Sequence, residues 1–328
     1  MDPRGFTVNV LPRETQIRIV AALVEGCSIR STERMLDVHR DTIMLLGLAI
    51  GERCAKLHNR LFRDLNVSVL ELDEAWSFVA KKQKRAGTAD REIGDQYLYI
   101  GMAANQKAIL SYSVGKRTSE TTNAFAADLR SRVLGRPQIT SDGFQPYVEA
   151  VELAFGEEVD FAQLMKVYAG DDRPQAEHRY SPGHLRSIER KVVQGAPDMS
   201  KVSTSYVERQ NLTLRMQMRR FTRLTNAFSK KLRNHKAAVA LHVAWYNLCR
   251  VHESLRVTPA MALGVTDHIW SVGELIDRSM TLDMTPVTPA PEPPPTFPAP
   301  TTTYTLRAPG GSGAIKRGGL RLLLGGKW

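Results

Sequence analysis

The stretch VSVLELDEAWSFVA, residues 67–80, is the feature that most limits how this chain folds. Apolar residues stand on both faces of the stretch, which is typical of a central strand covered on both sides. Asp73 and Glu74 lie at its centre, and an acidic pair there indicates a salt bridge or a metal site. Adjacent strand residues face opposite ways, so we expect only one of the two to join such a site. Asp73, which shares a face with Val67 and Val69, is the first choice, and Glu74 remains the alternative.

The segments that follow predict a mixed α/β layer fold. QYLYIGMAANQ and AILSYSVGKR indicate two more strands, which complete a three-stranded antiparallel meander. Residues 118–135 predict a helix with Thr118 or Ser119 as its N-cap and Gly135 at its end. A short strand over RPQITSDG, a helix over FQPYVEAVELAFG and a strand over DFAQLMKVYAG complete the order β-β-β-α-β-α-β. The polar residues 171–201 predict an insertion or a long loop.

Two further carboxylates stand in suggestive places along the chain. Asp142 follows the short apolar strand in QITSDG, and Glu208 lies near the start of the polar helix predicted in STSYVERQNLTL. Ligands commonly collect at the carboxyl ends of such strands, so Asp73, Asp142 and Glu208 can surround one point. Carboxylate oxygens suit Mg²⁺ or Mn²⁺ rather than zinc. Two such ions can hold the attacking and leaving oxygens of a phosphodiester displacement.

The Glu208 segment is also strongly basic. If residues 206–223 form one helix, Asn211, Arg215 and Arg219 share a face with Glu208. The nine Lys and Arg residues from Arg209 onward are not interrupted by any Asp or Glu until after position 236. Such a run can be a solvated face, but beside a candidate metal ligand it favours contact with DNA phosphates.

The N-terminal part of the chain predicts three short helices over residues 12–57. The last two have the spacing of a helix-turn-helix, in which the second helix enters the major groove of DNA. Arg40 and Thr42 open that helix and are candidates for contacts with bases or phosphates. A small helical bundle that serves packing is the alternative. The formal charge of +11 and the pI of about 9.7 favour a polyanionic partner, and above all nucleic acid.

These patterns predict three regions. Residues 1–62 would form the helix-turn-helix domain, and residues 63–282 the catalytic domain with its insertion. Residues 283–328 combine a proline-rich linker with a basic, glycine-rich tail that we expect to be disordered. No apolar run reaches the ~18 residues of a membrane span, and the three cysteines form no CxxC pair. The N-terminus lacks an apolar signal core, so a cytoplasmic location is expected.

Three motifs carry a resemblance to a known family. DEAW, SDGFQPY and YVERQNLTLRMQMRRFTR, in this order, resemble insertion-sequence transposases of the IS-one type over residues 67–264. The resemblance implies a DDE transposase with an RNase H-like catalytic core, and it places the metal ligands at Asp73, Asp142 and Glu208. The founding members of the family have a shorter gap between the second and third carboxylates. Glu189, which is also followed by Arg, therefore remains an alternative to Glu208.

The expected function is that of a DNA transposase. The protein would bind the terminal inverted repeats of its own element as double-stranded DNA, cut there, and join the 3′ ends to target DNA. Two Mg²⁺ or Mn²⁺ ions would serve the chemistry, and the protein would act as a homo-oligomer on DNA, without a membrane partner. A nuclease on the same core, which cuts but does not join, is one alternative. A DNA-binding regulator without catalytic activity is the other.

Overall fold

A six-stranded mixed sheet forms the centre of the computed structural model, which describes residues 11–87, 90–168, 185–222 and 225–281. Its strands in spatial order are β4 (Ala108–Gly115), β3 (Gly94–Ala103), β2 (Val69–Val79), β6 (Gln138–Ser141), β7 (Asp160–Tyr168) and β8 (Leu185–Gln194). The first three pair antiparallel, which confirms the predicted meander, and β6 then pairs parallel with β2 and β7 parallel with β6. The predicted tail, residues 283–328, lies outside the described residues.

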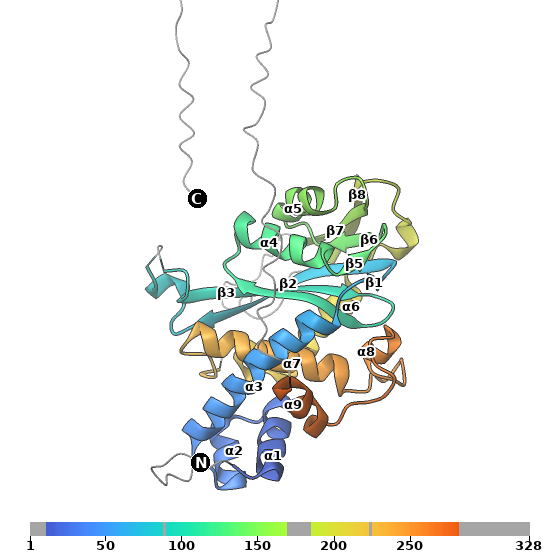
Figure 1. The fold of residues 1–328 in the computed structure, drawn as a ribbon. Helices are drawn as coiled ribbons and strands as arrows, with labels where there is room; N and C mark the ends of the chain where they lie inside the picture. Colours follow the sequence, from blue (N-terminus) through green and yellow to red (C-terminus); the bar gives the residue numbers. More distant parts are fainter. Residues whose placement is uncertain (1–10, 88–89, 169–184, 223–224, 282–328) are drawn as a thin grey trace, which may run out of the picture. The chain divides into compact units, whose positions relative to one another are not determined.

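Helices cover both faces of this sheet, as Figure 1 shows for α4 and α5 on one side and α6 and α7 on the other. Thr118 caps α4 (Ser119–Arg130) through its side chain, as predicted. This helix ends before Gly135, because the short strand β5 (Val133–Leu134) follows and pairs with β1 (Leu65–Asn66). α5 (Pro146–Phe155) contributes Tyr147 and Phe155 to the same core layer.

The opposite face is covered by α6 (Ser205–Gln217) and α7 (Leu232–Leu248). The expectation of one helix over residues 206–223 is wrong. The backbone of Met218 is extended, and a single 3-10 turn, η3 (Arg219–Phe221), follows it. Met218 and Phe221 are both buried, so the turn places these two apolar side chains in the core. Arg219 therefore does not lie on the Glu208 helix.

The three predicted N-terminal helices are present as α1 (Arg13–Val24), α2 (Ile29–Leu36) and α3 (Arg40–Leu61). Gly26 and Asp37 have positive φ angles, of 87° and 51°, at the two turns between them. The second half of α3 is buried, and Gly51 lies so close to the Ala237 backbone of α7 that a Cβ would overlap it. α3 is thus continuous from the N-terminal helices into the core, and the chain up to Asp283 forms one compact unit.

The predicted loop over residues 171–201 is partly wrong, because its second half forms the edge strand β8. β8 pairs antiparallel with β7, and eight of its ten residues are exposed. A strand exposed on both faces has no alternation of apolar and polar residues, which explains why its sequence is typical of a loop. Residues 169–184 lie outside the described part of the chain.

Short helical elements complete the described fold. They are η1 (Gln83–Arg85), η2 (Met199–Lys201), α8 (Pro259–Ala262) and α9 (Val272–Met280), and α9 packs against α1, α3 and α7. None of the helices described is both long enough and apolar enough to cross a lipid bilayer.

Candidate metal centre

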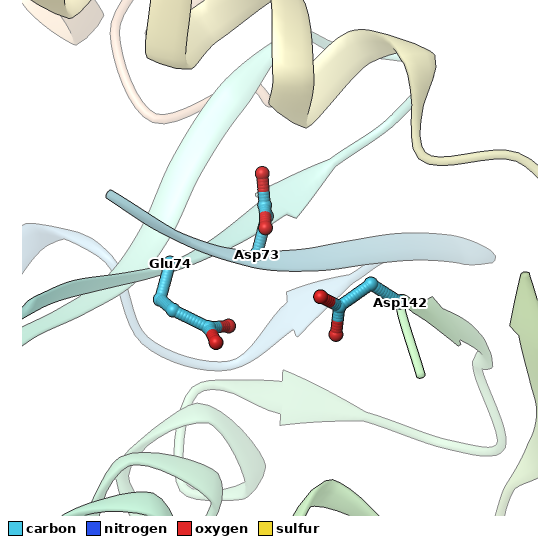
Figure 2. Close-up of side chains that lie close together, drawn as sticks. All are labelled: Asp73, Glu74 and Asp142. Carbon is cyan, nitrogen blue, oxygen red and sulfur yellow. The ribbon is translucent and has the colours of Figure 1, made fainter. Parts of the chain in front are cut away.

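Three carboxylates meet at the middle of the sheet. Asp73 and Glu74 come from β2 and Asp142 follows the end of β6, and one oxygen from each lies within 4.8 Å of the others (Figure 2). This is the only group of three or more His, Cys, Asp or Glu side chains with metal-binding geometry in the described parts of the chain. The structure therefore brings together two of the three predicted ligands, together with the alternative Glu74.

The strand register explains why residues so far apart in sequence meet. β2 and β6 run parallel, with Leu72 paired to Ser141, so Asp73 and Asp142 are the next residue on each chain. A turn fixes Asp142 just beyond the strand, because its Oδ1 accepts a hydrogen bond of 2.9 Å from the Phe144 amide. Gln163 of β7 donates to the Asp142 carbonyl at 2.9 Å and ties this turn to the next strand.

Only one member of the Asp73–Glu74 pair was expected to join the site, but both carboxylates lie close to Asp142. Figure 2 shows the two side chains leaving opposite sides of β2, with Asp142 beside the strand. The two side chains do alternate, as strand geometry requires. Asp142 follows the end of the neighbouring strand β6, where one oxygen of Asp73 and one of Glu74 both lie within 4.8 Å of it.

Asp73 is the carboxylate whose ionisation the fold opposes most clearly. Burial raises its pKa to about 7, and the charges of Glu74 and Asp142 add to the rise. Asn211 of α6 donates a hydrogen bond of 2.7 Å to Asp73 Oδ2 and favours the ionised form. Asn211 was predicted to contact DNA, but it is buried and its amide is directed at this carboxylate. A nearby cation would relieve the repulsion that now disfavours ionised Asp73.

Glu74 has stronger partners within the protein. Arg117 donates to its Oε1 at 2.7 Å, and the Tyr147 hydroxyl donates to its Oε2 at 3.1 Å. The Glu74 pKa is nevertheless raised, first by burial and then by the charge of Asp142. Glu74 is therefore held in place by an arginine on one side of the site, whereas the donors to Asp73 are the neutral backbone amide of Glu74 and the Asn211 side chain.

Glu208 does not lie in this group. Its carboxylate accepts hydrogen bonds from Lys166 Nζ of β7 at 2.5 and 2.6 Å and from the Thr204 hydroxyl at 2.6 Å. Its side chain is 42% exposed, so it can turn without disturbing the core. Glu208 and Asn211 are nearly one helical turn apart on α6, which places Glu208 on the helix that reaches Asp73. The alternative, Glu189, is exposed on β8, where it is paired with Met165.

Glu71 is a residue that the sequence analysis missed. It is 1% exposed, and its Oε2 accepts hydrogen bonds of 2.8 Å from the amides of Tyr206 and Val207. These are free amides of the first turn of α6, so Glu71 fixes the start of the helix that carries Glu208. Burial raises the Glu71 pKa to about 7, although these hydrogen bonds oppose the rise. An acidic residue two positions before Asp73, on the same strand face, was the available signal.

The predicted DNA-binding residues are distributed over several elements. Arg40 and Thr42 are exposed at the start of α3, and Arg209 is exposed on α6. Arg215 is half-buried near the end of α6, and Arg219 is exposed in the turn that follows. Part of the basic run has a structural role, because Arg220 donates to the Ser229 hydroxyl and the Asn234 carbonyl and Arg233 pairs with Glu52. Arg223 lies outside the described residues.

The donor set fits a hard divalent cation. All three members are carboxylates, the ligands that Mg²⁺ and Mn²⁺ favour. Two ligand oxygens on opposite sides of one Mg²⁺ ion are ~4 Å apart, since each bond is ~2.1 Å long. The oxygens of Asp73, Glu74 and Asp142 lie within 4.8 Å of one another, which is close to this distance. The mutual repulsion that raises the pKa values of Asp73 and Glu74 is what a cation would remove. The group can thus hold a divalent ion after small side-chain rotations.

Comparisons with known proteins give two sequence relatives, and no protein-family model matches the chain. The insertion element iso-IS1n protein InsB of Shigella dysenteriae is 25% identical over 175 residues, which cover 53% of this chain and 93% of InsB. The putative DNA repair protein recA homolog 4 of Arabidopsis thaliana is 25% identical over 143 residues, or 43% of this chain. That second alignment spans only 61% of the plant protein, less than two thirds of its length.

Solved transposase structures are among the structural neighbours, but the likeness is weak. The piggyBac transposase synaptic complex with hairpin DNA has a TM-score of 0.39 and 11% identity, over 81% of this chain and 69% of that one. The Mos1 strand transfer complex has a TM-score of 0.20 and 13% identity, over 71% and 77% of the two chains. These scores do not establish a common fold. The match to nearly all of InsB does confirm the resemblance carried by the three motifs, which is to insertion-sequence transposases of the IS-one type.

Proposed function

We propose that this protein is a DDE-type DNA transposase that binds the terminal inverted repeats of its element, cuts there, and joins the 3′ ends to target DNA. One observation carries the proposal: Asp73, Glu74 and Asp142 gather on a mixed sheet within 4.8 Å of one another. The gathered residues belong to two of the three motifs that resemble insertion-sequence transposases. The third motif forms α6, whose Asn211 donates to Asp73.

Asp73, Asp142 and Glu208 are the proposed ligands of two Mg²⁺ or Mn²⁺ ions. Such ions, when bound, activate a water or a 3′-hydroxyl as nucleophile and stabilise the departing 3′-oxygen. Asn211 donates to Oδ2 of Asp73, and one oxygen of Asp73 lies within 4.8 Å of an oxygen of Asp142 and one of Glu74. Glu74 would stay with Arg117 and contribute negative charge, and it remains the alternative ligand to Asp73.

Glu208 would have to leave Lys166 to reach the ions. Its ion pair is half-exposed, and pairs of this kind contribute only ~0–1 kcal/mol of stability. A divalent cation beside two ionised carboxylates offers a larger electrostatic gain than one ammonium group. We therefore infer that Lys166 holds Glu208 near the site until metal and DNA are bound.

The remaining predicted roles concern DNA. α2 and α3 would act as the helix-turn-helix, with Arg40 and Thr42 exposed at the start of the helix that enters the major groove. Arg209, Arg215 and Arg219 would contact phosphates, which give affinity without sequence information. We further propose that the protein acts as a homo-oligomer on DNA and resides in the cytoplasm.

Alanine variants of the proposed ligands test the chemistry. Asp73→Ala, Asp142→Ala and Glu208→Ala should each abolish Mg²⁺-dependent cleavage of duplexes taken from the DNA that flanks the gene. Binding of the same duplexes should stay nearly intact, because no cation is removed. Glu189→Ala is the matched control, since it deletes an exposed carboxylate of β8 and should cleave normally.

The pattern of active variants decides among the alternatives. An inactive Glu189→Ala beside an active Glu208→Ala would overturn the choice of Glu208. An active Asp73→Ala beside an inactive Glu74→Ala would overturn the choice of Asp73. Cleavage without any joined product would reduce the proposal to a nuclease, and binding without cleavage would leave a DNA-binding regulator.

A further inference from the structure

A cavity on the far side of α6 has no role in the chemistry proposed above. It encloses about 260 Å³ between α6, the end of β3 and the segment that follows α7. The polar side chains that line it include Lys107, Tyr206, Arg209, Tyr246, Arg250 and His252. Three of these residues belong to the run YNLCRVH, a sequence feature that the carboxylate site does not use.

The same run fixes the wall of the cavity. The Tyr246 hydroxyl donates a hydrogen bond of 2.8 Å to the carbonyl of Lys107 in the turn between β3 and β4. Asn247 accepts from the Ile109 amide at 3.0 Å and donates to the Ile109 carbonyl at 2.8 Å. All four residues are buried. The end of α7 therefore holds the β3–β4 turn through hydrogen bonds of the kind that a neighbouring strand makes. This wall of the cavity is fixed by the fold itself.

The backbone of Lys107 is strained. Its φ angle is 55°, in the left-handed region that residues with a side chain rarely adopt. Only 9% of the residue is exposed, so its ammonium is also largely desolvated. Its hydrogen-bond partner is the carbonyl of Ala104, and the ammonium lies 2.9 Å from the centre of the Tyr206 ring. Packing alone does not explain a cation at a position that favours glycine or asparagine.

The cations around this cavity form no ion pairs with the described carboxylates. Lys107, Arg209 and Arg250 lie within 4.0 Å of no carboxylate oxygen in the described part of the chain, and the charge of Lys107 acts on the buried Glu71 only from a longer distance. One guanidinium nitrogen of Arg250, Nη1, is buried without a hydrogen-bond partner there. Glu253 is the one acidic residue in the lining, so the described walls carry three cations against one anion. Three like charges around one cavity repel one another unless an anion lies between them.

We propose that this cavity binds a phosphate group of a DNA strand. Its volume is below the ~300 Å³ of typical small-molecule sites, which suits a single phosphate better than a whole nucleotide. Guanidinium and ammonium groups are the usual partners of phosphate oxygens. The Tyr206 ring, 44% exposed at the mouth, offers a surface for an adjoining base or sugar. The DNA source of the phosphate rests on the proposed function, whereas the anion site does not.

The bound phosphate would not be the one that is cleaved. Residues on a helix are ~100° apart, so Arg209 and Asn211 lie on nearly opposite sides of α6. Asn211 faces the carboxylates and Arg209 faces the cavity. The cavity therefore holds DNA at a second point and should contribute to affinity rather than to the chemical step.

The first test uses the full protein and inorganic phosphate. His252 lines the cavity, and burial together with the charges of Lys107 and Arg250 lowers its pKa below 6.5. A bound phosphate should raise this pKa, as followed by NMR titration of the ring, with His252→Gln used to assign the signal. Potassium chloride at equal ionic strength should leave it unchanged. A His252 pKa that does not respond to phosphate would overturn the anion site itself.

The second test uses random-sequence duplex DNA. The single phosphate held in the cavity contributes ~0.9 to the slope of log K against log salt. Between 50 and 200 mM salt, wild-type affinity should therefore fall about three- to fourfold more than that of the Lys107→Gln, Arg250→Gln double variant. The charge-matched control is Arg91→Gln with Arg278→Gln, two exposed arginines paired elsewhere, and it should keep the wild-type slope.

The outcomes separate this inference from the proposed function. A double variant with the wild-type salt slope would overturn the DNA phosphate site while leaving the transposase proposal intact. A wild-type protein that binds no DNA would overturn the transposase proposal, and the phosphate titration would still decide on the anion site. Cleavage by the double variant at saturating DNA should match the wild type within about twofold, and a larger loss would contradict the separation by α6.

Discussion

Replacing Asp73 with Asn should stabilise the protein in the absence of metal. The folded state raises the pKa of Asp73 from 3.8 to about 7, whereas the unfolded chain ionises it near 4. Above pH 7 the folded protein must therefore carry a charge that its surroundings oppose. Each unit of pKa shift corresponds to 1.36 kcal/mol, so this cost is about 4 kcal/mol at most. We expect ~2 kcal/mol, because Asp73 is adjacent to Glu74 and the two carboxylates share the cost of ionisation.

The pH dependence follows from the direction of the shift. Because the folded-state pKa lies above the unfolded-state pKa, stability falls as pH rises from about 4 to about 7 and stays low above that. The Asn side chain carries no charge and can still accept the hydrogen bond from Asn211. The variant should thus melt ~4–8 °C above the wild type at pH 8, at ~2–4 °C per kcal/mol, and close to it at pH 4.

Bound metal should make the wild type more stable than the Asp73→Asn variant. Mg²⁺ at 100 times its dissociation constant stabilises a protein by ~2.7 kcal/mol, and the Asp73→Asn variant should lose most of this gain. Asp128→Asn is the matched control, because Arg132 donates to that carboxylate at 2.8 and 2.9 Å and holds its pKa below the usual range. It should lower the melting temperature and keep the response to Mg²⁺. A metal-free Asp73→Asn variant that melts below the wild type at pH 8 would refute the reasoning.

Three further predictions concern the surroundings of the site. Glu71→Ala should lower the free energy of urea unfolding by ~1–3 kcal/mol, because two amides of α6 lose their acceptor, and Glu71→Gln should recover most of the loss. Lys166→Gln should tighten Mg²⁺ binding in calorimetry if Glu208 is a ligand, and an unchanged affinity would argue against that role. Gly51→Ala should destabilise by ~1–3 kcal/mol, because a Cβ would overlap the α7 backbone, whereas Gly47→Ala meets only a leucine methyl and should be nearly neutral.

Local patterns in the sequence were enough to predict the elements that build the site. β2 is apolar on both faces and Asp142 follows a short apolar strand, and both features were visible without the fold. The proximity of Glu74 to Asp73 and Asp142 could not be predicted, because the alternation of side chains along β2 argues against it. What decides that contact is the place of Asp142 beside the strand, which depends on the pairing of β2 with β6.

The errors have a common physical origin in long-range packing. α6 ends at Gln217, and Met218 and Phe221 of the following turn pack in the core. No local signal in the sequence, such as Gly or Pro, marks the end of this helix. β8 was missed because pairing with β7 stabilises it, while its side chains remain in solvent. The periodicity of apolar residues shows which face of a helix or strand is buried. It therefore cannot reveal a strand that is exposed on both faces.

The position of Glu208 shows how the metal-free fold keeps its acidic groups apart. Burial and the neighbouring carboxylates already raise the pKa values of Asp73 and Glu74, and a further carboxylate in the group would add to the cost of ionising them. Glu208 instead pairs with Lys166, an interaction that its half-exposed position makes weak. A bound cation would change the balance, because the group would then gain from a further negative charge. The ion pair with β7 is thus consistent with a ligand that joins the centre only once metal is present, and the response of Lys166→Gln to Mg²⁺ measures this coupling directly.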